Sequence, residues 1–202
     1  MQKKRILSII MLAFILTGMI GISAMAEGVG FEEKKDVISQ WGNYLSSKFY
    51  DADKTSRSSD DSEMEQAITF YELQGYDHKQ AQSLAEEYVK ESNAIYKKAL
   101  AEGYSVTEEE VSSYVEWLKD MYHNDPELNE DSKKQMEVMI NSFKNEEDYW
   151  EYLRGVYQKS LASQNYVEDL QNNYFAMNPE ASYADWETYF EDWKKRLLLK
   201  TN

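Results

Sequence analysis

Apolar residues recur at every third or fourth position along most of the chain, which is the spacing of amphipathic helices. Runs that alternate apolar and polar residues, as half-buried strands do, are absent, and only two Pro and eight Gly interrupt the sequence. The pattern predicts an all-α, single-domain fold of about six or seven helices. These helices are expected near residues 32–50, 62–74, 77–102, 107–122, 131–144 and 145–175, with a last helix from 182.

Capping residues support several of these boundaries. Asp77 is placed to cap the helix that follows it, because an Asp side chain accepts a hydrogen bond from an unpaired amide of the first turn. Thr107 and Glu110 have the spacing of a capping box, in which each side chain accepts a hydrogen bond from the other residue's amide. Gly75 and Gly103 end predicted helices, where a left-handed residue is favoured.

The first 26 residues have the pattern of a signal peptide. Lys3, Lys4 and Arg5 precede an apolar run from Ile6 to Ile22, and a small-x-small cleavage pattern follows at Ala24 and Ala26. We expect cleavage after Ala26 and an exported, extracytoplasmic protein of a bacterium, in the cell envelope or secreted. The alternative is an uncleaved anchor, since 17 residues approach the length that spans a bilayer; only then would the protein contact a membrane.

The rest of the chain divides at a polar stretch. Residues 51–61 carry no apolar anchor and predict a linker. The expected organisation is a signal peptide over 1–26, an N-terminal helix with the linker over 27–61, and a helical domain over 62–202.

The composition makes this an acidic protein and excludes several classes of partner and chemistry. With 22 Lys and Arg against 37 Asp and Glu, the formal net charge is −15, which argues against binding of nucleic acid. The absence of Cys excludes disulfides, thiolate nucleophiles and cysteine-based metal sites.

No motif in the chain predicts catalysis or a cofactor. Phosphate-binding glycine loops and the common hydrolase motifs are absent, and His78 and His123 lack a ligand at metal-binding spacing. Pairs of carboxylates are numerous, but among 37 acidic residues they arise by chance and are typical of solvated helix faces. We therefore expect no catalytic residues, no metal and no cofactor.

Methionine and aromatic residues gather around one predicted loop. They are Trp117, Met121, Met136, Met139 and Phe143, on the two helices that flank residues 123–131. Such side chains form adaptable apolar surfaces and predict a peptide-binding groove. The alternative is that these stripes are ordinary core, as aromatic residues at helical spacing usually are.

Residues 63–122 resemble the N-terminal helical domain of SurA-type and PrsA-type chaperones and foldases. The resemblance is carried by the run ALAEGYSVTEEEVSSYV over 99–115, which matches the family pattern at Ala99, Gly103, Val106, Thr107, Glu109, Glu110 and Val111. The segment from Asn145 to Trp150 resembles a later helix start, so that the similarity covers about 60–172. The resemblance implies a SurA-like extracytoplasmic module that holds unfolded polypeptide.

The chain departs from that family in one respect. Members usually carry a parvulin prolyl isomerase domain, whereas here about ten residues around Pro179 separate the sixth predicted helix from the last. The final 17 residues resemble the family's closing helix, so isomerase activity is not implied.

These observations predict an exported, non-catalytic, chaperone-like binder of unfolded or extended polypeptides. The alternatives are a docking or structural subunit of a cell-envelope complex and a carboxylate-dependent glycan hydrolase. The sequence does not indicate the oligomeric state.

Overall fold

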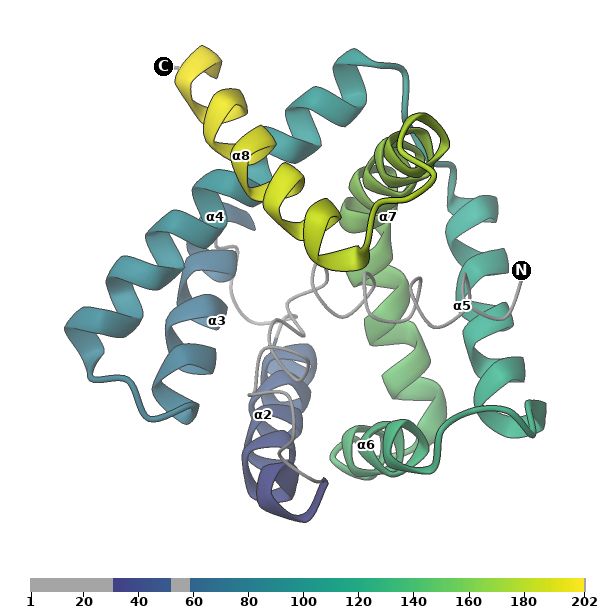
Figure 1. Cartoon of the computed structure of the whole chain (residues 1–202). Helices are drawn as coiled ribbons and strands as arrows, with labels where there is room; N and C mark the ends of the chain where they lie inside the picture. Colours follow the sequence, from purple (N-terminus) through teal and green to yellow (C-terminus); the bar gives the residue numbers. More distant parts are fainter. Residues whose placement is uncertain (1–30, 52–58, 202) are drawn as a thin grey trace.

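The computed structural model describes residues 31–51 and 59–201. The predicted signal peptide, with Ala24 and Ala26, and most of the predicted linker lie outside the described residues. Within them, the chain is helical and contains no strand, which confirms the predicted all-α class (Figure 1). The helices are α2 (Phe31–Asp51), α3 (Ser59–Leu73), α4 (His78–Ala101), α5 (Glu108–Asn124), α6 (Glu130–Asn141), α7 (Glu146–Met177) and α8 (Tyr183–Thr201).

The predicted caps form as expected. The Thr107 hydroxyl accepts from the Glu110 amide at 3.2 Å, and the Glu110 carboxylate accepts from the Thr107 amide at 2.7 Å. Asp77 accepts from the amide of Gln80, three residues on. Gly75 and Gly103 have φ of 94° and 91°, values that a residue with a Cβ atom adopts only with strain. These ends are fixed by contacts within a few residues, which is why the sequence predicts them.

The helices pack around three hydrophobic clusters. The first cluster joins α2, α5, α6 and the first half of α7, with Phe70 of α3. The second cluster joins α3 to α4, and the third joins the later parts of α4 and α7 to α8. Both long helices, α4 and α7, contribute to two clusters each, so they connect the packing of the molecule. Among the described residues, no helix is long and apolar enough to cross a bilayer.

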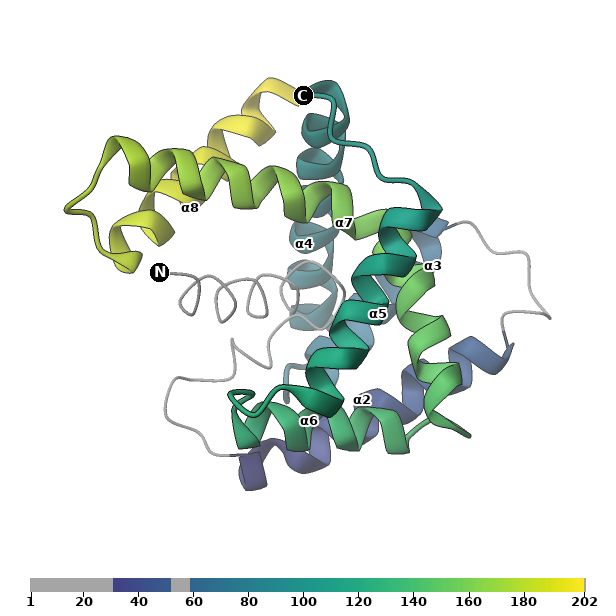
Figure 2. The same ribbon diagram turned by 90° about the vertical axis from the view of Figure 1, so that its right-hand side faces the viewer.

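Helix α7 changes direction in its middle, as Figure 2 shows. The Ser160 hydroxyl donates to the Val156 carbonyl at 3.2 Å, a bond from a serine to the preceding turn that bends helices. No proline lies within α7. Residues before the bend pack in the first cluster, up to Leu161, and residues after it pack in the third cluster, from Val167.

Helix α2 belongs to the main core. Its residues Ile38, Trp41 and Leu45 are buried in the first cluster, together with residues of α5, α6 and α7. At the C-terminal end of α2, the Tyr50 hydroxyl donates to Asp148 of α7 and accepts from the Lys144 amide. The helix of the predicted 27–61 segment is therefore not separate from the 62–202 domain.

Helix α8 closes the third cluster through aromatic packing and an ion pair. Trp186 is buried, and Phe190 stacks on both Trp186 and Trp193, with ring centroids 5.2 and 5.6 Å apart. Lys194 lies 2.8 Å from Glu91 of α4. The apolar stripe that predicted this last helix is the face that holds it against α4 and α7.

A close approach of α2 to α6 leads to the first prediction. A Cβ atom on Gly42 would lie 2.8 Å from the Cβ of Ser142 and 2.4 Å from its hydroxyl oxygen, which already bonds the Val138 carbonyl. Gly42→Ala is therefore expected to destabilise the protein by about 1–3 kcal/mol.

Gly155 supplies the matched control, because a Cβ atom there meets nothing within 4 Å. Gly155→Ala is expected to stabilise α7 by about 0.5–1 kcal/mol, since alanine favours a helix interior. Urea midpoints should move in opposite directions for the two variants. A tolerated Gly42→Ala would contradict the α2–α6 packing, and a destabilising Gly155→Ala would show that the bend in α7 needs glycine.

Candidate functional site

The residues predicted to form a peptide groove lie mostly in the first cluster. Met121, Met136, Met139 and Phe143 are buried, with exposed fractions of 2–7 %, and they pack with residues of α2 and α7. Trp117 differs, with 38 % of its surface exposed. The groove reading is therefore wrong for the four buried residues, because α2 covers the side of α6 that it required to be open. Only Trp117 stays accessible to a partner.

Helices α5 and α7 run antiparallel, and charged side chains join them along one side. Basic and acidic residues alternate between the two helices at the C-terminal part of α5. The ion pairs are His123–Glu146 at 2.7 Å, Lys119–Glu147 at 2.7 Å and Glu116–Arg154 at 2.7 Å. Arg154 also contacts Glu151 at 2.8 Å. The pairing fixes the register in which α5 lies along α7.

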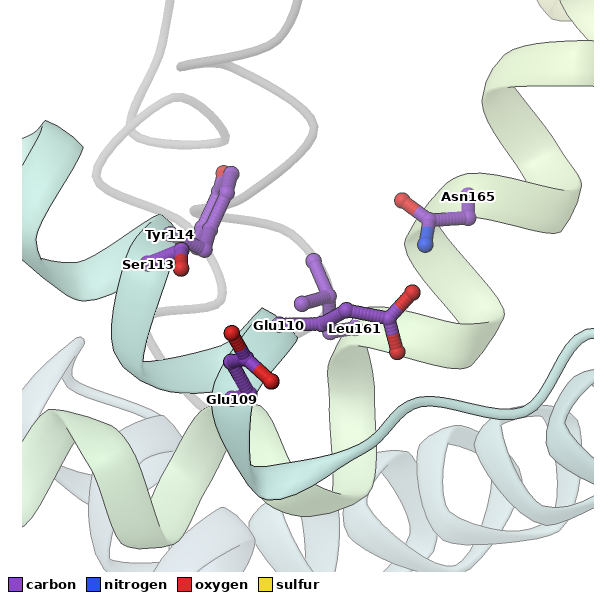
Figure 3. Close-up of a pocket in the computed structure, with 6 residues that line it drawn as sticks. All are labelled: Glu109, Glu110, Ser113, Tyr114, Leu161 and Asn165. Carbon is purple, nitrogen blue, oxygen red and sulfur yellow. The ribbon is translucent and has the colours of Figure 1, made fainter.

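At the other end of the pair, next to the bend in α7, the two helices leave an open pocket. The α5–α7 pocket has a volume of ≈ 500 Å³ and is lined by Glu109, Glu110, Ser113, Tyr114, Leu161 and Asn165. In Figure 3 the carboxylate of Glu110 and the amide of Asn165 point toward the same opening, with Leu161 between the helices. Leu161 and Asn165, from the middle of α7, thus face the N-terminal part of α5 across the pocket.

Tyr114 connects the pocket to the exposed Trp117. Its ring lies 5.5 Å from the Trp117 ring, one turn along α5, and 4.8 Å from the ring of buried Tyr157. Burial, and then the charge of Glu168, raise the pKa of Tyr114 to about 12, so its hydroxyl keeps its proton at neutral pH. The Tyr114 hydroxyl is itself buried, so the pocket offers the aromatic ring of Tyr114 beside two carboxylates.

Both histidines are held by carboxylates on the surface. His78 lies 2.7 Å from Glu72, and His123 lies 2.7 Å from Glu146. Within residues 31–51 and 59–201, no group of three or more metal-ligating side chains is brought together.

The sequence reading missed Tyr114, Leu161 and Asn165. Tyr114 and Trp117 are three residues apart on α5, and Leu161 and Asn165 are four apart on α7, so each pair shares a helix face. That spacing predicts two neighbours on each helix, but it does not show that the two faces meet, because the meeting depends on the bend in α7.

Comparisons with known proteins gave no match: no protein-family model fits the chain, and no curated protein or solved structure is significantly similar to it. The chemistry of the site therefore rests on the geometry of its own residues.

The burial of the methionines yields a second prediction. A Met136→Glu/Met139→Glu variant places two charges without partners in the first cluster, at a cost of several kcal/mol, comparable with the whole stability of a domain. We expect the variant to lose its cooperative thermal transition. A folded double variant that melts near the wild-type temperature would contradict this burial and show that the two methionines line an exposed groove.

The α5–α7 ion pairs predict sensitivity to acid. The hydrogen bond from the Trp150 indole, followed by that from His123, lowers the pKa of Glu146. A carboxylate with a lowered folded-state pKa stabilises the protein above its unfolded pKa, and this contribution is lost as the pH falls through the folded value.

Glu146→Gln should therefore reduce stability at pH 7 and have little effect at pH 3. We expect a difference in unfolding free energy of less than about 1 kcal/mol at pH 7, since the pair is partly solvated. The urea midpoints of the wild type and of Glu146→Gln, measured at pH 7 and at pH 3, give this difference. A difference that stays constant from pH 7 to pH 3 would mean that the Glu146 charge does not stabilise the fold.

Proposed function

We propose that the protein binds unfolded or extended polypeptide without catalysis, and that the α5–α7 pocket and Trp117 form its binding surface. The observation that carries this proposal is the partly exposed Trp117 ring beside Tyr114, at the edge of an open pocket. Tryptophan and tyrosine supply large contact areas at binding surfaces and dominate the energetics of many interfaces.

The surroundings of the pocket suit a partner that arrives in extended form. The pocket is open, so side chains of a passing chain enter it without a change in fold. Leu161 offers an apolar contact, while Ser113 and Asn165 offer hydrogen bonds to a backbone. Such a mixture of apolar and polar contacts binds a polypeptide transiently and with little selectivity for its sequence.

The described carboxylates favour binding over hydrolysis. A glycosidase needs one carboxylic acid whose pKa is raised, so that it can donate a proton. The Asp and Glu residues with a shifted pKa in the described part of the chain are Glu110, Glu146, Glu147 and Asp185, and each is lowered. These groups serve helix caps and ion pairs, which supports a non-catalytic role.

The cellular setting is part of the same proposal. The N-terminal pattern, with Ala24 and Ala26, supports export to the cell envelope or the outside of a bacterium. The resemblance of residues 60–172 to the helical domain of SurA-type and PrsA-type chaperones supports a role in holding unfolded clients there.

The test compares Trp117→Gln with Met177→Gln. Met177 is also an exposed apolar residue, 74 % exposed, but it lies at the far end of α7. Suppression of aggregation of a reduced, unfolded client is expected to weaken about tenfold for Trp117→Gln, because aromatic anchors carry much of the binding energy. Met177→Gln should match the wild type, and both variants should keep a cooperative melting transition.

Two results would contradict the proposal. Equal suppression by all three proteins would show that Trp117 is outside the binding surface. A wild-type protein that never suppresses aggregation and shows no affinity for unrelated unfolded chains would remove the chaperone function and favour a docking subunit.

A further inference from the structure

Some carboxylates between α5 and α7 form ion pairs with a basic residue of the chain, and others do not. Around the C-terminal part of α5, Glu116, Glu146 and Glu147 each contact a basic residue of the neighbouring helix. At the α5–α7 pocket, Glu109 forms no ion pair with any described residue, and the Glu110 carboxylate bonds only to Thr107. Among the described residues, no Lys or Arg lines the pocket.

We infer that the α5–α7 pocket binds a basic side chain, arginine or lysine, of the polypeptide whose binding is proposed above. This inference names the chemistry of that partner and depends on the proposed function. Lys119 and Arg154 form ion pairs with carboxylates of the neighbouring helix. A basic side chain of a bound polypeptide would form the corresponding ion pair at the pocket.

The residues that line the pocket suit both parts of such a side chain. The aliphatic stem of arginine or lysine packs on apolar surface, here Leu161, while the charged end reaches polar groups. The faces of Tyr114 and Trp117 attract a cation through their ring electrons. Glu109 and Glu110 then accept hydrogen bonds from the ammonium or guanidinium group.

Further charge at the edge of the pocket favours the same occupant. Glu168, on the part of α7 after the bend, lies near enough to raise the pKa of Tyr114. The carboxylates that line the pocket itself are Glu109 and Glu110. An acidic side chain would meet these carboxylates with no described cation to offset them.

The competing explanation is general attraction of basic chains by a protein of net charge −15. Binding by general attraction weakens equally whichever carboxylates are removed, whereas binding in the pocket weakens only when the pocket carboxylates are removed. Glu109→Gln/Glu110→Gln removes two charges from the pocket and keeps the capping box, because glutamine serves at that position. Glu86→Gln/Glu87→Gln removes two adjacent charges from the exposed face of α4 and is the matched control.

The experiment measures fluorescence anisotropy of three labelled, unstructured peptides of equal length on the full chain. They share the same leucine residues and carry arginine, glutamine or glutamate at the intervening positions. For the wild type and the α4 control we expect the arginine peptide to bind about fivefold tighter than the glutamine peptide. For Glu109→Gln/Glu110→Gln we expect the two affinities to become similar, with circular dichroism unchanged.

The outcomes distinguish failure of the cation site from failure of the proposed function. If the glutamine peptide binds the wild type and arginine adds nothing, or if both double variants lose the preference equally, the cation site is overturned and polypeptide binding remains. If none of the three peptides binds the wild type, the proposed function fails as well.

Discussion

The change of direction in α7 is the constraint on which the arrangement of the described helices depends. The bend in the middle of α7 sends its second half toward α4 and α8 (Figure 2). The first half packs with α2, α5 and α6, and the second half packs with α4 and α8. The described helices thus pack around separate clusters that the long helices connect, and the α5–α7 pocket lies next to the bend.

Packing and electrostatics both shape the surface around the α5–α7 pocket. Trp117 and Tyr114 lie at the flank of α5, next to a core that needs only the opposite face of the helix. Along the C-terminal part of α5, Lys119 and His123 pair with carboxylates of α7, and Glu116 pairs with Arg154 of α7. At the pocket, no described Lys or Arg lies beside Glu109 and Glu110. The partly exposed aromatic rings leave apolar surface in water, and a bound polypeptide would cover it.

The sequence was sufficient to predict features that depend on residues close to one another in the chain. It was insufficient to predict features that depend on contacts between distant segments. Helix boundaries followed from periodicity, and the ends at Asp77, Thr107 and Gly103 followed from capping chemistry within one turn. The placement of Met136 and Met139 did not follow, because an apolar stripe looks the same whether another helix covers it or not. What covers it is α2, which approaches α6 through Gly42 from nearly a hundred residues away. The bend in α7 was missed because serine bends a helix through a side-chain bond that leaves the apolar periodicity intact.

The central claim is the proposal that the surface between α5 and α7, next to the bend, binds an unfolded chain. Amide chemical shifts, followed by NMR while an unfolded polypeptide is added, test it directly, since they report contacts along every described helix at once. The account predicts changes concentrated at residues 109–117 of α5 and 161–168 of α7. Changes confined to α8 or to the α3–α4 pair, with these residues unaffected, would contradict it.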